Sequence, residues 1–227
     1  MLLLAIDTSG KEGSIALADG DAGRCNILGM ASLEGGAFSA QLVPQIAELL
    51  ANHNRVKRDI GAFAAVSGPG SFTGLRVGLA AVKALAEVLT RPIAAVSLLE
   101  ALAAESHEPA LAAESHEPAL AAMDAGRKEI YLRMPNGEES LFTQEEFLAA
   151  SKGRTTVTAD KSIADLARAA GLNIKEIPRP RSDAVARLGW KKIQSGETVS
   201  PEALDANYIR RSDQLFARTD QKPEPGN

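Results

Sequence analysis

Short apolar runs and longer helical patterns alternate along residues 1–100. Each apolar run ends at small or polar residues, as a buried strand ends at its turns, and such runs lie at residues 2–6, 14–18, 25–31, 62–67 and 93–96. Apolar residues recur at helical spacing over 39–51, where Ser39 is placed to cap the helix, and again from 74 to about 90. This order of strands and helices predicts an α/β fold.

The second half repeats the pattern with which the chain begins. Residues 120–132 contain an apolar run that ends at an aspartate, then a turn with a basic residue and a glutamate, then a second apolar run, so Asp124 corresponds to Asp7. We therefore predict two lobes on one plan, an N-terminal lobe over 1–100 and a C-terminal lobe over 101–218. Further elements predicted in the second lobe are helices over 143–150, 161–170 and 182–194 and strands over 155–158 and 174–177.

Two segments of the second half are not expected to join its core. Residues 103–111 read AAESHEPAL, and residues 112–120 repeat these nine letters without change. Two copies this short cannot stack a core as solenoid repeats do, so we predict that the extra copy is an exposed connection. Residues 219–227 are polar and rich in proline, and we predict a disordered tail there.

The composition is that of a mildly acidic globular protein. The chain has 25 Lys and Arg against 29 Asp and Glu, and this formal net charge of −4 argues against a protein that grips nucleic acid over its whole surface. Cys25 is the only cysteine, which excludes an internal disulfide and a cysteine-rich zinc site. The opening apolar run is too short for a signal peptide or a membrane span. We expect a cytoplasmic protein with no membrane partner.

The turn after the first strand and a glycine-rich segment are candidates for binding phosphate. A glycine-rich loop before a helix offers N–H groups to an anion, and an aspartate at a strand end can meet a nucleotide or its hydrated Mg²⁺. The glycine spacing matches neither the dinucleotide fingerprint nor the P-loop, so a structural turn is the alternative. The candidate nucleotide- or phosphate-binding residues are Asp7, Thr8, Ser9, Gly68, Gly70, Ser71, Gly74 and Arg76.

Metal and nucleophile chemistry have little support in the sequence. The histidines are His53, His107 and His116, and none has the His-Glu-x-x-His spacing of a zinc-binding helix. No Gly-x-Ser-x-Gly elbow for a nucleophilic serine is present. We therefore predict no metal site and no catalytic residue.

Four segments together resemble the TsaB (YeaZ) family. They are residues 6–9, 67–78, 123–131 and 207–210, and the most specific is the run Ser-Gly-Pro-Gly-Ser-Phe-Thr-Gly-Leu-Arg that begins at Ser67. The resemblance implies two ribonuclease-H-like lobes of the actin, sugar-kinase and heat-shock ATPase (ASKHA) superfold. It also implies a role in threonylcarbamoylation of the adenosine next to the anticodon of ANN-decoding tRNAs, as a non-catalytic partner of the catalytic paralogue TsaD and the ATPase TsaE.

At one place the chain differs from TsaD-like sequences in a way that affects catalysis. TsaD-like sequences have metal ligands as His-x-x-x-His after the strand that matches residues 93–96, whereas this chain has Leu98 and Leu102 there, and leucine cannot ligate a metal. The resemblance thus implies that this chain has no cofactor of its own and that ATP is used by the partner complex. It also implies that the chain contacts tRNA only through that complex. A small ATPase or kinase and a metallopeptidase of the same superfold are the alternatives.

The two helices predicted in the first lobe carry more apolar residues than one sheet face can cover. Exposed apolar surface is typical of a contact with a partner. We expect these helices to contact TsaD, and to form a homodimer when TsaD is absent. The candidate partner-binding residues are Leu42, Val43, Ile46, Leu75, Leu79 and Val82.

Overall fold

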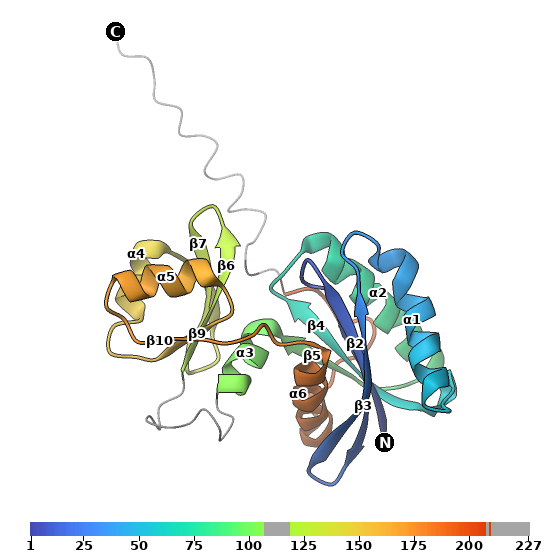
Figure 1. Cartoon of the computed structure of the whole chain (residues 1–227). Helices are drawn as coiled ribbons and strands as arrows, with labels where there is room; N and C mark the ends of the chain where they lie inside the picture. Colours follow the sequence, from blue (N-terminus) through green and yellow to red (C-terminus); the bar gives the residue numbers. More distant parts are fainter. Residues whose placement is uncertain (107–118, 208, 210–227) are drawn as a thin grey trace.

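The computed structural model describes residues 1–106, 119–207 and 209, which form two lobes that lie next to each other (Figure 1). Most of the duplicated segment and all of residues 219–227 lie outside the described residues, so the predicted exposed connection and disordered tail stay predictions. Each lobe contains one five-stranded sheet. The α/β class and the two-lobed ASKHA-like fold predicted from the sequence are confirmed.

All five strands predicted in the first half are present. They are β1 (Leu2–Asp7), β2 (Gly13–Asp21), β3 (Arg24–Leu33), β4 (Ile60–Gly68) and β5 (Ile93–Ser97). Their order in the sheet is β3-β2-β1-β4-β5, antiparallel from β3 to β1 and parallel from β1 to β5. Every residue of β1 is buried, as expected for a central strand that has helices on both faces.

Helices cover both faces of the first sheet. The helices α1 (Phe38–Asn52) and α2 (Phe72–Leu89) lie side by side on one face, and α6 (Ser182–Ser195) lies on the other (Figure 1). A glycine brings α6 close to the sheet, since a Cβ at Gly189 would collide with the Cβ of Ala64. Close approach of this kind fixes α6 against β4.

The second lobe follows the same plan in a shorter form. Its elements are β6 (Leu120–Gly126), β7 (Glu129–Arg133), β8 (Glu139–Thr143), α4 (Gln144–Ala150), β9 (Thr156–Thr158), α5 (Lys161–Ala169) and β10 (Ile174–Glu176). Read from β8, the strand order is β8-β7-β6-β9-β10, which corresponds strand by strand to β3-β2-β1-β4-β5. The repeated pattern that begins at residue 120 therefore reflects two sheets of the same topology.

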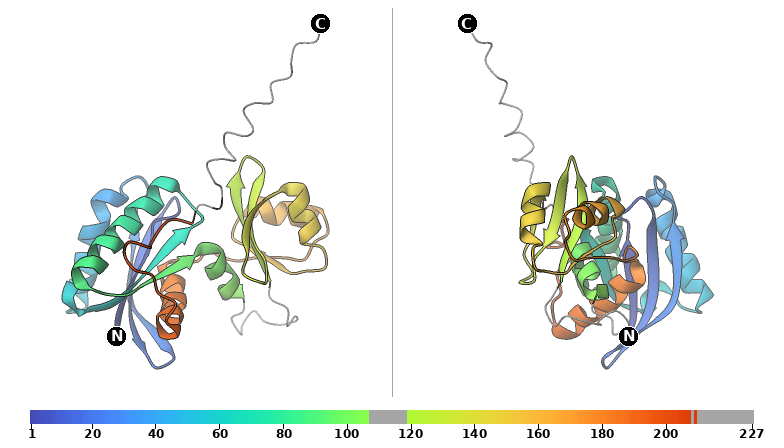
Figure 2. Two further views of the ribbon diagram at one scale, coloured as in Figure 1. Left: turned by 180° about the vertical axis from the view of Figure 1, so that it is seen from behind. Right: turned by 60° about the vertical axis from the view of Figure 1, so that its left-hand side comes forward.

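Two helices depart from the predicted division at residue 100. The helix α3 (Leu98–Ser106) contacts strands of both sheets (Figure 2). The helix predicted over 182–194 was assigned with the second lobe, but α6 packs on the first sheet. Helical periodicity identifies the apolar side of α6, but it does not indicate which of two sheets that side covers.

Local signals at helix ends succeeded in some places and failed in others. Thr143 caps α4 in a reciprocal capping box with Glu146, as the Thr-x-x-Glu pattern predicts. Ser39 was predicted to cap the first helix and does not, because α1 begins at Phe38, whose buried ring lies next to Gly13 and Gly74. Neither β8, whose residues are only partly buried or exposed, nor α3 was predicted.

Candidate functional site

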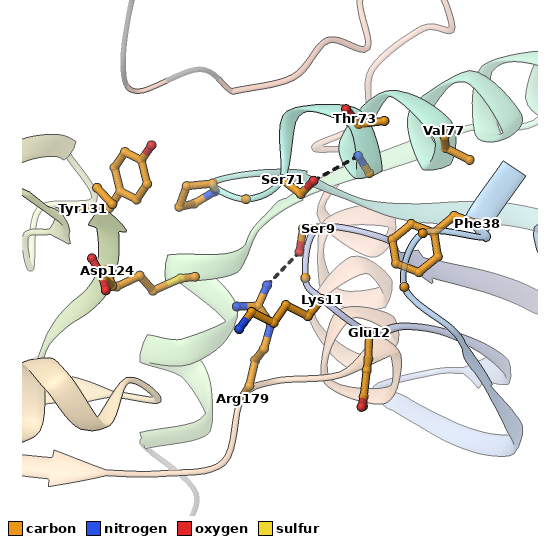
Figure 3. Close-up of a pocket in the computed structure, with 18 of the residues that line it drawn as sticks. Ser9, Lys11, Glu12, Phe38, Ser71, Thr73, Val77, Asp124, Tyr131 and Arg179 are labelled. Carbon is orange, nitrogen blue, oxygen red and sulfur yellow. Dashed lines mark hydrogen bonds between the residues drawn. The ribbon is translucent and has the colours of Figure 1, made fainter. Parts of the chain in front are cut away.

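A cavity of about 850 Å³ lies between the lobes (Figure 3). The first lobe contributes the turn after β1, the loop before α1 and the start of α2. The second lobe contributes Met123, Asp124, Tyr131 and Asp160, and Arg179 enters from the segment that joins β10 to α6. The cavity is therefore the place where the turn after β1 and the start of α2 face the second lobe.

The carboxylate of Asp7 is engaged within its own turn. Asp7 is buried, and its Oδ1 accepts hydrogen bonds from the Ser9 N–H at 2.8 Å and from Ser9 Oγ at 2.5 Å. Ser9 Oγ in turn accepts a hydrogen bond from Arg179 Nη2 at 3.0 Å (Figure 3). Asp7 does not line the cavity, and this geometry matches an aspartate that caps its turn.

The glycines of the segment 68–78 allow α2 to pack directly against this turn. A Cβ at Gly70 would lie 2.5 Å from Ser9 C=O, and a Cβ at Gly74 would collide with Thr8 C=O. Thr8 Oγ1 donates a hydrogen bond to Gly74 C=O at 2.7 Å, and the Ser71 N–H donates to Ser9 C=O at 2.7 Å. Close packing alone thus accounts for these glycines, as the structural-turn alternative expects.

The structure brings only half of the candidate phosphate-binding residues to the cavity. Those that line it are Ser9, Gly70, Ser71 and Gly74, whereas Asp7, Thr8, Gly68 and Arg76 do not. Arg76 instead lies over the ring of Phe72, with its guanidinium carbon 3.6 Å from the ring centroid. Sequence reasoning missed Arg179, because nothing in the local sequence shows that it contacts Ser9, 170 positions away.

The charged residues around the cavity are of both signs. Lys11 and Arg179 are cations, and Glu12, Asp124 and Asp160 are anions. Asp124 resembles Asp7 in capping its own turn, since its Oδ1 accepts from the Gly126 N–H at 2.7 Å. Asp160 Oδ2 accepts from the Asp124 N–H at 2.8 Å. Both second-lobe carboxylates that line the cavity therefore hold backbone groups in place.

The resemblance to TsaD-like sequences matches Leu98 and Leu102 to metal ligands, and in this structure both positions lie in the core. Leu98 and Leu102 are both buried in α3, where they fill apolar space between the lobes. Among the described residues, no group of three or more His, Cys, Asp and Glu side chains is arranged to hold a metal ion.

The predicted partner-binding residues need correction, because five of the six are buried inside the first lobe. Val43 is 63% exposed, but the other five belong to the core, and they are Leu42, Ile46, Leu75, Leu79 and Val82. The periodic apolar stripe marks the inner side of each helix, which faces the sheet. The partner surface predicted from that stripe was therefore placed on the wrong side of the helices.

The outer sides of α1 and α2 nevertheless carry a group of exposed apolar residues, alongside the exposed polar residues Ser39, Glu48, Asn52, Thr73, Arg76 and Glu87. We call this surface the outer face, and it comprises the exposed residues Ala40, Val43, Pro44, Ala47 and Ala51 of α1 and Ala80, Ala84 and Val88 of α2. Because α1 and α2 contact each other on one side of the sheet, these residues belong to neighbouring helices. Solvated helices normally present polar residues at such positions.

Two sheets of one topology with a cleft between them define a two-lobed α/β protein of the ASKHA-like class. A family model described as TsaD, tRNA N6-adenosine threonylcarbamoyltransferase, matches residues 34–203, and the chain belongs to this family. Among the described residues, no helix is long and apolar enough to span a membrane.

Individual relatives confirm the resemblance to the TsaB (YeaZ) family. The chain is 26% identical over 229 residues to the tRNA threonylcarbamoyladenosine biosynthesis protein TsaB of Escherichia coli (strain K12), covering 93% of this chain and 96% of that protein. It is 35% identical over 102 residues to the protein of the same name from Bacillus subtilis (strain 168), a match that spans 45% of this chain and only 43% of that protein. The solved structure of YeaZ from Pseudomonas aeruginosa has a TM-score of 0.72 at 24% identity, covering 92% of this chain and 100% of that one.

Proposed function

We propose that this protein acts in the biosynthesis of threonylcarbamoyladenosine in tRNA, as a non-catalytic partner of a TsaD-type threonylcarbamoyltransferase. The names of the TsaB relatives support the pathway. The observation that carries the non-catalytic role is the burial of Leu98 and Leu102, since apolar core occupies the positions at which TsaD-like sequences place metal ligands. The protein needs no cofactor of its own, and ATP is used by the partner complex, which includes TsaE.

The outer face is the surface through which we propose that this protein binds TsaD. Burial of exposed apolar side chains favours association, and the outer face extends over both α1 and α2. In the absence of TsaD, the same face pairs two copies of this chain, so that homodimer and TsaD complex exclude each other. The chain meets tRNA only through that complex, in keeping with its net charge of −4.

Reconstitution tests the role. Purified TsaD and TsaE are incubated with threonylcarbamoyl-AMP, ATP and an ANN-decoding tRNA, with and without this chain, and the modified nucleoside is measured by mass spectrometry. We expect modification to depend on the added chain, while the chain alone produces none. Equal modification in its absence would remove the proposed role, and modification by the chain alone would show that it is an enzyme.

A pair of matched variants tests the surface. Val43→Glu places a charge on the outer face, whereas Val56→Glu places one at a position of nearly equal exposure, 62%, outside both helices. Because a charge without a partner is costly to bury, Val43→Glu should weaken TsaD binding by about tenfold or more, and Val56→Glu should leave it unchanged. Titration by isothermal calorimetry measures TsaD binding, and sedimentation measures the homodimer. Equal behaviour of the two variants would place the interface elsewhere.

A further inference from the structure

A single carboxylate of the second lobe joins three separate parts of the chain. Glu139 is the first residue of β8, and its side chain is only 8% exposed. Its Oε1 accepts hydrogen bonds from Ser97 Oγ at 2.5 Å and from Arg133 Nη1 at 3.0 Å, and its Oε2 accepts one from Asn207 Nδ2 at 3.0 Å. Ser97 ends β5 of the first lobe, Arg133 ends β7 of the second, and Asn207 lies beyond α6.

Asn207 carries this connection to the loop at the interlobe cavity. The segment after α6 runs back along the first lobe, where the Val199 N–H donates to Ile93 C=O at 2.9 Å and the Asn207 N–H donates to Ser67 C=O at 2.7 Å. Asn207 also lies against Gly68, since a Cβ at that glycine would be 2.7 Å from Asn207 C=O. The next residues, Pro69 and Gly70, line the 850 Å³ cavity.

A second ion pair lies close to Glu139 at the boundary of the lobes. Lys192 of α6 lies 2.9 Å from Glu100 of α3, and both side chains are largely buried. These two residues line a separate cavity of about 390 Å³ together with Ser97, Glu139 and Asn207. Arg133 donates a further hydrogen bond to Gly137 C=O at 2.9 Å, which holds the turn between β7 and β8. Two ion pairs therefore face one small polar space at the boundary of the lobes.

The geometry constrains the position of the lobes more than it stabilises the fold. Withdrawing a carboxylate from water costs free energy that an ion pair alone repays only in part. Glu139 accepts from all three donors only when the lobes are arranged as they are here. If the lobes separated, Glu139 would keep Arg133, which lies in its own lobe, and would lose Ser97 and Asn207. We propose that Glu139 is a positioning residue that latches the second lobe to the first and, through Asn207, holds the Gly68 loop at the wall of the interlobe cavity.

Distance measurements between the lobes test the latch. Spin labels at Lys57→Cys in the first lobe and Lys161→Cys on α5, in a Cys25→Ser background diluted with unlabelled chain, report one interlobe distance by pulsed electron resonance. We expect a single narrow distribution that Glu139→Ala broadens. Glu139→Gln should keep it narrow, because its amide oxygen still accepts from Ser97 and Arg133 and only the bond from Asn207 is lost. A narrow, unshifted distribution in Glu139→Ala would overturn the latch.

The neighbouring residue provides the control. Glu138 is exposed, and its carboxylate accepts a hydrogen bond from Asn136 Nδ2 within the hairpin turn, so Glu138→Ala removes a carboxylate next to the latch without touching the first lobe. We expect its interlobe distribution to equal that of the unmodified chain. Broadening as large as that of Glu139→Ala would assign the effect to the hairpin and not to Glu139.

Hydrogen exchange tests the link to the loop. In Glu139→Ala, the amides of Val66, Ser67, Gly68 and Gly70 and of residues 204–207 should exchange about tenfold faster, because a charge-assisted hydrogen bond no longer holds Asn207. Amides of β6 should be unchanged. If Glu139→Ala does not fold, Asn207→Ala serves instead, since it leaves the pair of Glu139 and Arg133 intact. Unchanged exchange at residues 66–70 in the variant used would contradict the positioning role.

Discussion

The two lobes have the same strand order, but their helices face solvent differently. In the first lobe, the outer sides of α1 and α2 present alanine, valine and proline, with Glu48, Arg76 and Glu87 as their exposed charged residues. In the second lobe, α5 presents Lys161, Asp165 and Arg168, whose ion pairs measure 3.1 and 3.3 Å. The large hydrophobic residues that are exposed in the described part of the chain also all belong to the first lobe. This difference in surface between two lobes of equal topology supports the proposal that the partner binds the first lobe.

The turns that follow the first strand of each lobe differ in a related way. In the first lobe the turn at Asp7 is covered by α2 and the loop before it, through Gly70, Gly74 and Gly78, so the place next to the aspartate is filled by protein. In the second lobe, a Cβ at Gly126 would meet nothing within 4 Å. The turn at Asp7 is thus tightly packed against α2, whereas the turn at Asp124 has open space at Gly126.

The largest expected effect distinguishes the inner and outer sides of the first-lobe helices. Leu75→Glu buries a charge without a partner in the core and should destabilise the fold by about 4 kcal/mol or more, enough to prevent folding. Val43→Glu, on the outer face, should leave the free energy of unfolding within about 0.5 kcal/mol of its original value. Urea unfolding followed by circular dichroism measures both. A folded Leu75→Glu protein would mean that this side of α2 is not core.

An intermediate effect tests the contrast between the two turns. Gly74→Ala drives a methyl group into the backbone at Thr8 and should cost about 3 kcal/mol, which lowers the melting temperature by about 10 °C. Gly126→Ala has open space and pays only for its positive φ of 73°, at a cost of about 1 kcal/mol and about 3 °C. Differential scanning calorimetry compares them. Equal shifts would show that α2 does not pack on the turn.

The smallest effect concerns the thiol of Cys25, which reports on the first lobe alone because the chain has no other cysteine. Burial raises the pKa of this thiol, and the nearby Arg187 only partly opposes the shift. A raised pKa leaves less thiolate at neutral pH, so iodoacetamide should react more slowly with the folded protein than with the chain in urea. The rate should rise with pH beyond the range typical of a free cysteine. Equal rates in the two states would contradict this.

Sequence patterns predicted those features that depend on neighbours in the chain. The strands of the first lobe and the Thr143 capping box rest on local periodicity and local hydrogen bonds, and both are present. The cap at Ser39 failed because α1 starts where Phe38 finds its tertiary contacts. The apolar stripe of α2 identified Leu75 correctly as part of a continuous apolar side, but periodicity does not say whether that side faces the sheet or a partner.

Contacts between segments that are distant in the chain could not be predicted from the sequence. Arg179 reaches Ser9 and Asn207 reaches Glu139 because the chain returns from the second lobe to the first through α6. Neither residue belongs to a pattern whose spacing indicates that contact. Residues that are far apart in the sequence therefore meet at the boundary of the lobes, and local patterns do not reveal such contacts.

The measurement that tests the central claim most directly compares the outer face with the cleft in the reconstituted reaction. The reaction contains TsaD, TsaE, threonylcarbamoyl-AMP, ATP and tRNA. We add the unmodified chain, Val43→Glu or Lys11→Ala, each at a series of tenfold-spaced concentrations, and quantify the modified nucleoside. Lys11 lines the interlobe cavity and Val43 does not. We predict that Lys11→Ala supports modification as well as the unmodified chain, whereas Val43→Glu requires about tenfold more protein for the same yield. Loss of modification with Lys11→Ala and full modification with Val43→Glu would contradict the account.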